Sequence, residues 1–265
     1  ADIAFHGGWS TSIIQNENIK MHLGAGVKYV LSYAYFDFSA SGNQIGGVSA
    51  ISGNPFELDA SVTPSEIYSS TQPVGKGWGF DVGATLQLHD KFTLGASVID
   101  IGTMRYQANL IAFKDFIVDT INFSGVDYTN PALLIQDIVK DEALLQYTGI
   151  ESFNVAMPTR LRIGAGYDVF ENLTLGADLV MPLADVAGNF PDPSFGLGAE
   201  LRLANIFKFS SGISFGAGYA SAIPFGLGID LGFWELGFAT RDITTWFGQQ
   251  SPYASFAFGL LRFKI

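Results

Sequence analysis

The segment NLTLGADLVMPL, from Asn172 to Leu183, alternates in polarity with a period of two residues. Its odd-numbered positions carry leucine, alanine or methionine, whereas its even-numbered positions carry mainly small or polar residues. Because successive side chains of a β-strand point to opposite faces, this pattern predicts a strand with one apolar face. The segment is also close to the roughly 9 to 11 residues that cross a bilayer as a tilted strand.

The same alternation recurs along the whole chain and predicts an all-β fold. In the segment 76–88 Trp78 and Phe80 share a face, and in the segment 206–219 Phe207 and Phe209 do so. The expected strands are residues 2–12, 19–38, 76–88, 91–106, 156–168, 172–183, 193–203, 206–219, 223–232, 234–242 and 253–265. About eleven antiparallel strands of this length predict an outer-membrane β-barrel, with about 12 to 14 strands in the native protein.

Composition agrees with a membrane barrel and excludes several other classes. Hydrophobic residues make up 48% of the 265 positions, and there are 31 glycines and no cysteine. Such a chain buries too much apolar surface to be disordered, and without cysteine it has no disulfides. Its net charge of −11 argues against nucleic acid as a partner. The apolar stretch 213–239 contains too many glycines for a spanning helix.

The second face of the predicted strands separates a barrel from a soluble β-sandwich, whose outer face is charged. Here that face is mainly glycine, serine and threonine, with charges of both signs, as expected of a crowded, wet lumen. The polar residues expected to line the lumen are Lys20, Lys28, Asp81, Arg160, Arg162, Asp178, Glu200, Arg202, Lys208 and Asp230. The residues expected to face lipid are Trp78, Phe80, Leu173, Leu175, Phe207, Phe209, Phe215 and Leu227. Mixed signs predict interior ion pairs rather than a filter for one ion.

Short and long connections alternate along the chain and predict its orientation. Short links at 89–90, 170–172, 204–205 and near 234 are expected in the periplasm, together with the C-terminus. The long links 39–75, 107–156, 184–192 and 242–252 are expected outside the cell.

An odd strand number predicts that residues 1–265 form a single barrel domain that lacks at least one preceding strand. The alternatives are a truly odd barrel, or a missed hairpin within 39–75, where 56–62 resembles a strand.

The long loop 107–155 contains the best helix signal, near 131–147. Its apolar positions, spaced as on one helix face, are Leu133, Leu134, Ile138 and Leu144. We expect either a plug or docking surface, or an ordinary helix packed on the rim of the barrel.

Catalytic, metal and cofactor motifs find little support, so a non-enzyme without cofactor or metal is expected. None of His6, His22 and His89 lies in a metal-spacing motif. A serine hydrolase would need His22 beside Ser32 or Ser97, and these residues are better explained as polar lumen positions. The loop residues Asp185, Asp192 and Asp242 lack a calcium-binding loop, and solvated charge is the simpler interpretation.

The terminal strand 253–265 changes parity along its length. Phe256 and Phe258 share one parity, whereas Leu261 and Phe263 share the other. A bulge near Leu260 would let both sets face lipid.

Two stretches resemble a known family: GKGWGFDVGATLQLHDKFTLGASVIDIG (75–102) and MPTRLRIGAGYDVFENLTLGADLVMPL (157–183). They resemble a Bacteroidota family of outer-membrane barrels of unassigned function. That family is distantly similar to the FadL-like barrels, which include long-chain fatty-acid transporters and the barrel subunit of type IX secretion. The resemblance implies a multi-pass barrel in the outer membrane and carries no catalytic or ligand motif.

Two functions remain open at this point. The first is a non-enzymatic subunit of a larger outer-membrane assembly, in contact with lipid and with other outer-membrane proteins, which the aromatic loops favour. The alternative is a FadL-like passive transporter of small hydrophobic molecules, which the glycine-lined lumen favours.

Overall fold

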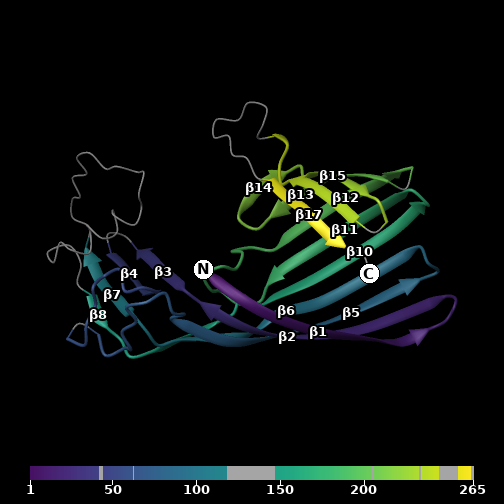
Figure 1. The fold of residues 1–265 in the computed structure, drawn as a ribbon. Coiled ribbons are helices and arrows are strands. Elements are labelled where there is room, and N and C mark those ends of the chain that lie inside the picture. The colour runs from purple at the N-terminus through teal and green to yellow at the C-terminus, as the bar shows by residue number, and fades with distance from the viewer. Residues whose placement is uncertain are drawn as a thin grey trace. The chain divides into compact units, whose positions relative to one another are not determined.

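The computed structural model describes residues 1–41, 44–61, 63–117, 147–204, 206–232, 234–244 and 256–263 (Figure 1). The elements assigned in these ranges are β-strands, and adjacent strands pair antiparallel. The predicted all-β antiparallel fold is therefore confirmed. Within the same ranges there is no helix of the length and apolarity needed to traverse a bilayer.

Among the described residues, thirteen strands form one large sheet, and eleven of them follow one another along its main path. In spatial order they are β1 (Asp2–Gln15), β2 (Ile19–Ser32), β5 (Gly75–Leu88), β6 (Phe92–Tyr106), β10 (Arg160–Phe170), β11 (Leu173–Pro182), β12 (Ser194–Leu203), β13 (Phe207–Gly216), β15 (Phe225–Asp230), β16 (Trp234–Thr240) and β17 (Phe256–Phe263). Each of the eleven predicted segments overlaps one of these strands. Two short strands pair at the side, β9 (Phe153–Ala156) with β6 and β14 (Tyr219–Ala222) with β13.

A second sheet of four strands, counted among the described residues, lies mostly in regions that the sequence pattern assigned to long links. It also takes the end of the expected strand 19–38, which the structure divides at Tyr33. Its strands are β3 (Ala34–Ser41), β4 (Gln44–Ile51), β7 (Leu110–Ile117) and β8 (Tyr147–Gly149). The links 39–75 and 107–156 are thus partly strand, and the hairpin that overlaps the first link spans 34–51 and not 56–62. Consecutive residues are fully buried in β4 (Ser49 and Ala50). A strand covered on both faces does not alternate in polarity, which explains the error. The helix predicted near 131–147 lies outside the described residues.

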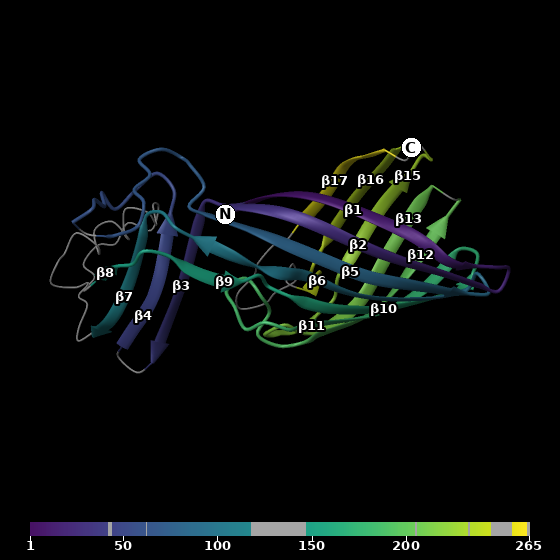
Figure 2. The same ribbon diagram turned by 90° about the horizontal axis from the view of Figure 1, so that it is seen from below.

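The chain divides into two compact units. The first comprises residues 1–7, 27–80 and 101–157, and the second comprises 8–26, 81–100 and 158–265. Figure 2 shows the four-stranded sheet, which belongs to the first unit, and β10 to β13, which belong to the second.

The first unit has a conventional packed core. It is built from Ala50, Val74, Met104, Tyr106, Ala108, Leu110 and Met157. The ring of Tyr106 stacks on Phe153 with 4.9 Å between centroids. Buried Asn109 is fully hydrogen-bonded, since it donates to the Ile51 and Tyr68 carbonyls and accepts from the Tyr68 N–H. Because its polar atoms are all hydrogen-bonded, the Asn109 side chain can be fully buried, at 0% exposure.

The strand register of the second unit defines two distinct faces, because residues paired across antiparallel strands lie on the same face. Along β10 to β13, Gly166 pairs with Gly176, Gly176 with Gly198, and Gly198 with Gly212. We call this the glycine-rich face. It also carries Gly164, Thr174, Asp178, Gly196, Glu200, Ser210 and Ser214. The opposite or apolar face carries Leu161, Ile163, Tyr167, Leu175, Leu179, Phe195, Leu197, Leu201, Phe207, Phe209 and Phe215.

Two irregularities adjust which side chains reach each face. Asp100 in β6 has a φ of 60°, and its N–H donates to Asp81 Oδ1 at 2.8 Å. In the part of β6 that precedes Asp100, the even-numbered residues lie on the apolar face. Val98, for example, pairs with Leu161 of that face. After it the odd-numbered Ile101, Thr103 and Arg105 are the exposed residues of β6. In β17 the register shifts between Gly259 and Arg262, so the bulge predicted near Leu260 is confirmed.

Candidate lumen face

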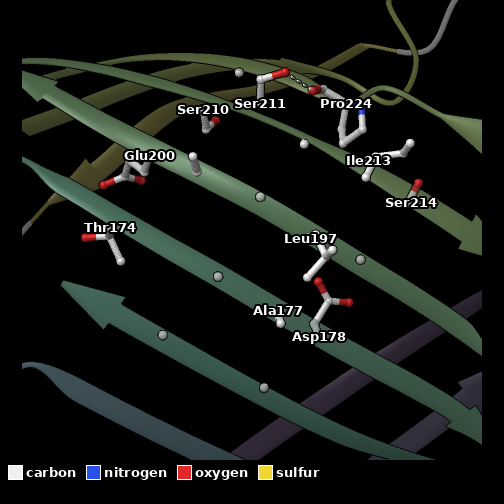
Figure 3. Close-up of a pocket in the computed structure, with 18 of the residues that line it drawn as sticks. Thr174, Ala177, Asp178, Leu197, Glu200, Ser210, Ser211, Ile213, Ser214 and Pro224 are labelled. Atoms are coloured by element: carbon white, nitrogen blue, oxygen red, sulfur yellow. Dashed lines mark hydrogen bonds between the residues drawn. The ribbon is translucent and has the colours of Figure 1, made fainter. Parts of the chain in front are cut away.

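A hollow of about 710 Å³ lies over the glycine-rich face of the second unit. Residues of β5, β6, β10 to β13, β15 and β16 line it, together with Pro224. The row Gly166, Gly176, Gly198 and Gly212 runs across its middle, and these residues leave the space that larger side chains would fill. In Figure 3 the labelled residues that line the hollow, apart from Pro224, lie on adjacent strands.

The chemistry of this lining is neutral or acidic. Between the glycines stand the hydroxyls of Thr174, Ser210 and Ser214 and the carboxylates of Asp178 and Glu200 (Figure 3). Ser211 donates to the Pro224 carbonyl at 3.1 Å. Among the described residues that line the hollow none is a lysine or an arginine. The lining therefore offers an anion no positive charge within the hollow.

Ion pairs gather beside the hollow, toward the short turns of β12, β13, β15 and β16. Lys208 Nζ lies 2.9 Å from Asp230 Oδ2 and 2.7 Å from Glu235 Oε1, and all three side chains are mostly buried. Arg202 Nε donates to Glu200 Oε1 at 2.8 Å in a more exposed pair. Thus Lys208 and Arg202, the basic residues at this end of β12 and β13, are both neutralised.

The ten predicted lumen residues occupy three kinds of position. Register places seven of them on the glycine-rich face or its continuation: Arg160, Arg162, Asp178, Glu200, Arg202, Lys208 and Asp230. Lys20 pairs with Asp90 at 2.6 Å, next to the turn between β5 and β6. Lys28 lies in the first unit, and its side chain passes so close to Gly79 that a Cβ added at Gly79 would contact it. Asp81 accepts the hydrogen bond from the N–H of the irregular Asp100. Arg160 turns to a loop, where it donates to Asn189 and stacks over Phe190.

Seven of the eight residues predicted to face lipid are exposed to solvent in this structure: Trp78, Phe80, Leu175, Phe207, Phe209, Phe215 and Leu227. Leu173 is half-buried. Trp78 is 57% exposed and packs against Tyr29 with ring centroids 4.9 Å apart. Together these exposed side chains give the described strands an apolar surface.

His22 meets a different serine from the two that the sequence suggested. Its Nδ1 lies 3.0 Å from Ser12 Oγ, across β1 and β2. Ser32 instead accepts a hydrogen bond from the Tyr106 hydroxyl. Sequence separation cannot reveal which serine lies opposite a histidine, because the answer depends on the strand register. In the described part of the chain no group of three His, Asp or Glu side chains is placed to hold a metal ion.

Asp242, considered above as a loop acid, instead holds two chain segments together. It is 4% exposed, and its Oδ1 accepts from the Ile223 N–H, the Thr244 N–H and the Thr244 hydroxyl at 3.2, 2.9 and 2.7 Å. Burial by itself would raise the pKa of Asp242, but these hydrogen bonds and the charge of Arg241 hold it below its usual value. The acid is therefore bound in its ionised form.

We expect Asp242→Ala to lower the free energy of unfolding by about 2 kcal/mol at neutral pH, because it leaves buried donors unpaired. A lowered folded-state pKa adds stability above the unfolded pKa of about 4, and this gain is lost as the pH falls through the folded value. Urea unfolding at several pH values should show the gap between the two proteins closing in acid. A gap independent of pH would contradict this role of the carboxylate.

The fold is thus an antiparallel all-β protein whose large sheet has one apolar and one glycine-rich face, with a hollow over the glycine-rich face. The chain belongs to the family of unknown function DUF5723, whose profile matches residues 4–240. Comparison with curated proteins finds no match.

Several solved structures are similar in part. The toluene transporter TodX of Pseudomonas putida shares 13% identity at a TM-score of 0.47, over 90% of this chain and 63% of TodX. The toluene transporter TbuX of Ralstonia pickettii shares 11% identity at a TM-score of 0.45, over 91% of this chain and 62% of TbuX. The monoaromatic hydrocarbon channel CymD shares 13% identity at a TM-score of 0.43, over 91% of this chain and 69% of CymD. The chain thus spans less than two thirds of TodX and of TbuX.

Proposed function

We propose that this chain forms the wall of a β-barrel in the bacterial outer membrane. The exposed apolar face supports this, since a row of phenylalanine and leucine side chains is stable in contact with lipid and unstable in contact with water. The short turns and the C-terminus lie on the periplasmic side, and the longer links lie outside. Aromatic residues such as Trp78 then stand where barrels carry their interfacial girdle.

Within that barrel the glycine-rich face forms a passage for small, uncharged, mainly apolar molecules. The observation that carries this proposal is the hollow of about 710 Å³ over the glycine row. Backbone and small side chains present a smooth surface to a neutral molecule. The carboxylate of Asp178, with no cation among the described lining residues, disfavours an anion of the same size.

Vesicles with a lipopolysaccharide outer leaflet allow a direct test, because that leaflet slows the passive entry of apolar molecules. We expect the reconstituted protein to speed the entry of neutral phenylnaphthylamine over protein-free vesicles. Entry of the anionic analogue anilinonaphthalene sulfonate, which has a similar aromatic skeleton, should stay near the background. Equal acceleration of both probes would contradict a passage selective for neutral molecules.

A matched pair of variants links the flux to the hollow. Gly166 and Gly176 face each other on the glycine-rich face, and a Cβ on either meets nothing nearer than 3.9 Å. Gly166→Phe with Gly176→Phe should reduce the flux about tenfold or more by filling the passage, which is a barrier increase of about 1.4 kcal/mol or more. Ile163→Phe with Leu179→Phe places two phenylalanines on the same paired strands but on the opposite face and outside the hollow, and should leave the flux unchanged. Equal losses in both variants would point to damaged folding and not to a blocked passage.

A second candidate, a subunit of an outer-membrane assembly, is supported by one surface of the first unit. Phe36 and Phe38 lie on the exposed side of β3, which is an edge strand of the four-stranded sheet. Their rings stack with centroids 6.1 Å apart, and they are 39% and 52% exposed. Isolation from the native membrane in mild detergent should recover stoichiometric partners that Phe36→Ser with Phe38→Ser releases. Recovery of the barrel alone would count against this candidate.

A further inference from the structure

The outer surface of the first unit carries a lysine and an arginine side chain at the same end of neighbouring strands. Lys76 begins β5 and Arg105 is near the end of β6, and both are exposed. They line one pocket of about 290 Å³ together with Tyr29, Tyr68, Gln72 and Gln107. Within the described residues neither cation has a carboxylate partner. In a chain of net charge −11, two cations that have no carboxylate partner among the described residues and line one pocket form a local concentration of positive charge.

The side chains around Lys76 and Arg105 are compatible with a bound anionic group. Across β6 and β9 Arg105 pairs with Asn154, which is exposed beside it. A nearby acid, Glu66, accepts a hydrogen bond from the Tyr68 hydroxyl at 2.6 Å. Arginine presents a planar set of donors that matches phosphate oxygens, and lysine adds a compact charge. Together these groups suit a phosphate, whose oxygens can contact both cations, better than a neutral sugar.

The position of the pocket along β5 indicates that the phosphate belongs to a membrane lipid. Trp78 lies on the same face of β5 as Lys76 and two residues further along, which is roughly 7 Å. Its ring packs on Tyr29, and Phe80 continues the exposed apolar surface beyond it. Tryptophan and tyrosine mark the interface between hydrocarbon and headgroups. Lys76 and Arg105 lie two residues nearer the strand ends than this aromatic pair, at the ends opposite the short turn at 89–91. In the proposed membrane placement this is the depth of the lipid headgroups.

We propose that Lys76 and Arg105 form a binding site for the phosphorylated headgroup of an outer-leaflet lipid, with its acyl chains along Trp78 and Phe80. This inference rests on the proposed placement of the apolar face in the outer membrane. The occupant is a membrane lipid with a phosphorylated headgroup, not a free anion, because Tyr29, which lines the pocket, packs on Trp78 of the exposed apolar surface. Binding there adds a specific lipid contact to the otherwise nonspecific lipid belt of the barrel.

The experiment uses the full chain in phosphatidylcholine vesicles that contain a minority of lipid A. After extraction in mild detergent, native mass spectrometry measures the fraction of protein that retains one lipid A. We expect Lys76→Gln and Arg105→Gln each to lower the affinity about fivefold, and the double variant to lose more. Lys91→Gln removes the same charge from the turn at the other end of these strands and should bind like the wild type.

Each other outcome contradicts a distinct part of the proposal. If the protein floats with the vesicles but K76Q and R105Q retain as much lipid A as the wild type, the site is wrong while the membrane placement stands. If inorganic phosphate alone displaces lipid A, the pocket binds free anions and the lipid source is wrong. If the wild type does not float at all, the proposed function fails and the lipid site fails with it.

Discussion

Replacing Gly212 with alanine should destabilise the protein by about 3 kcal/mol, although the change adds a single methyl group. A Cβ at this position would overlap the Leu197 carbonyl oxygen and approach the Gly198 Cα to 3.0 Å. Both contacts are with backbone atoms of β12, which cannot rotate away as a side chain can. The two strands must separate locally, and the cost includes strained hydrogen bonds between β12 and β13.

Gly176→Ala is the matched control for this change. Gly176 belongs to the same row of paired glycines, but the nearest atom to its added Cβ is the Ala165 carbonyl oxygen at 3.9 Å. We expect its stability to be unchanged or to rise by about 0.5 kcal/mol, because alanine has less backbone freedom to lose than glycine. Urea unfolding of the two variants in detergent micelles provides the comparison. Similar midpoints would show that the approach of β12 to β13 is looser than the structure indicates.

The glycine row shows which part of the fold could be predicted from the sequence. In β10 to β13 one face is apolar and the other is small, so parity alone assigned the faces, and the register agrees with that assignment. The pattern could not predict that four of these glycines lie side by side, because that depends on the register of each pair. It also could not separate glycines that need their small size, such as Gly212, from those with room, such as Gly176.

Three strands of the four-stranded sheet, β4, β7 and β8, were missed for a different physical reason. Ser49 and Ala50 in β4, and Leu110 and Ile111 in β7, are all fully buried, so these neighbouring positions show no alternation between a buried and an exposed face. The irregular Asp100 in β6 was also missed, and it changes which parity is exposed. A lone aspartate in an apolar strand was the available signal. The sequence shows that residue but not its partner, Asp81, which is 19 positions away in the chain.

The second large effect concerns Lys208, which two carboxylates share. Lys208→Met should lower the free energy of unfolding by about 3 kcal/mol, the low end of the range for breaking a buried ion pair, since each of the three side chains keeps some exposure. The loss arises less from the missing attraction than from what remains. Asp230 and Glu235 are 14% and 18% exposed, and they would face each other across β15 and β16 with no lysine between them.

A compensated variant separates these two contributions. Lys208→Met combined with Asp230→Asn and Glu235→Gln removes every charge of the cluster. The new asparagine oxygen can still accept the hydrogen bond that Asp230 now accepts from the Gly232 N–H at 2.9 Å. We expect most of the lost stability to return, because a neutral cluster has no uncompensated charge to solvate. The measurement is the unfolding midpoint of the wild type, the single variant and the triple variant under the same conditions. If the triple variant were as unstable as Lys208→Met, the attraction itself would contribute more than the leftover charge, and these ion pairs would hold the end of the sheet together.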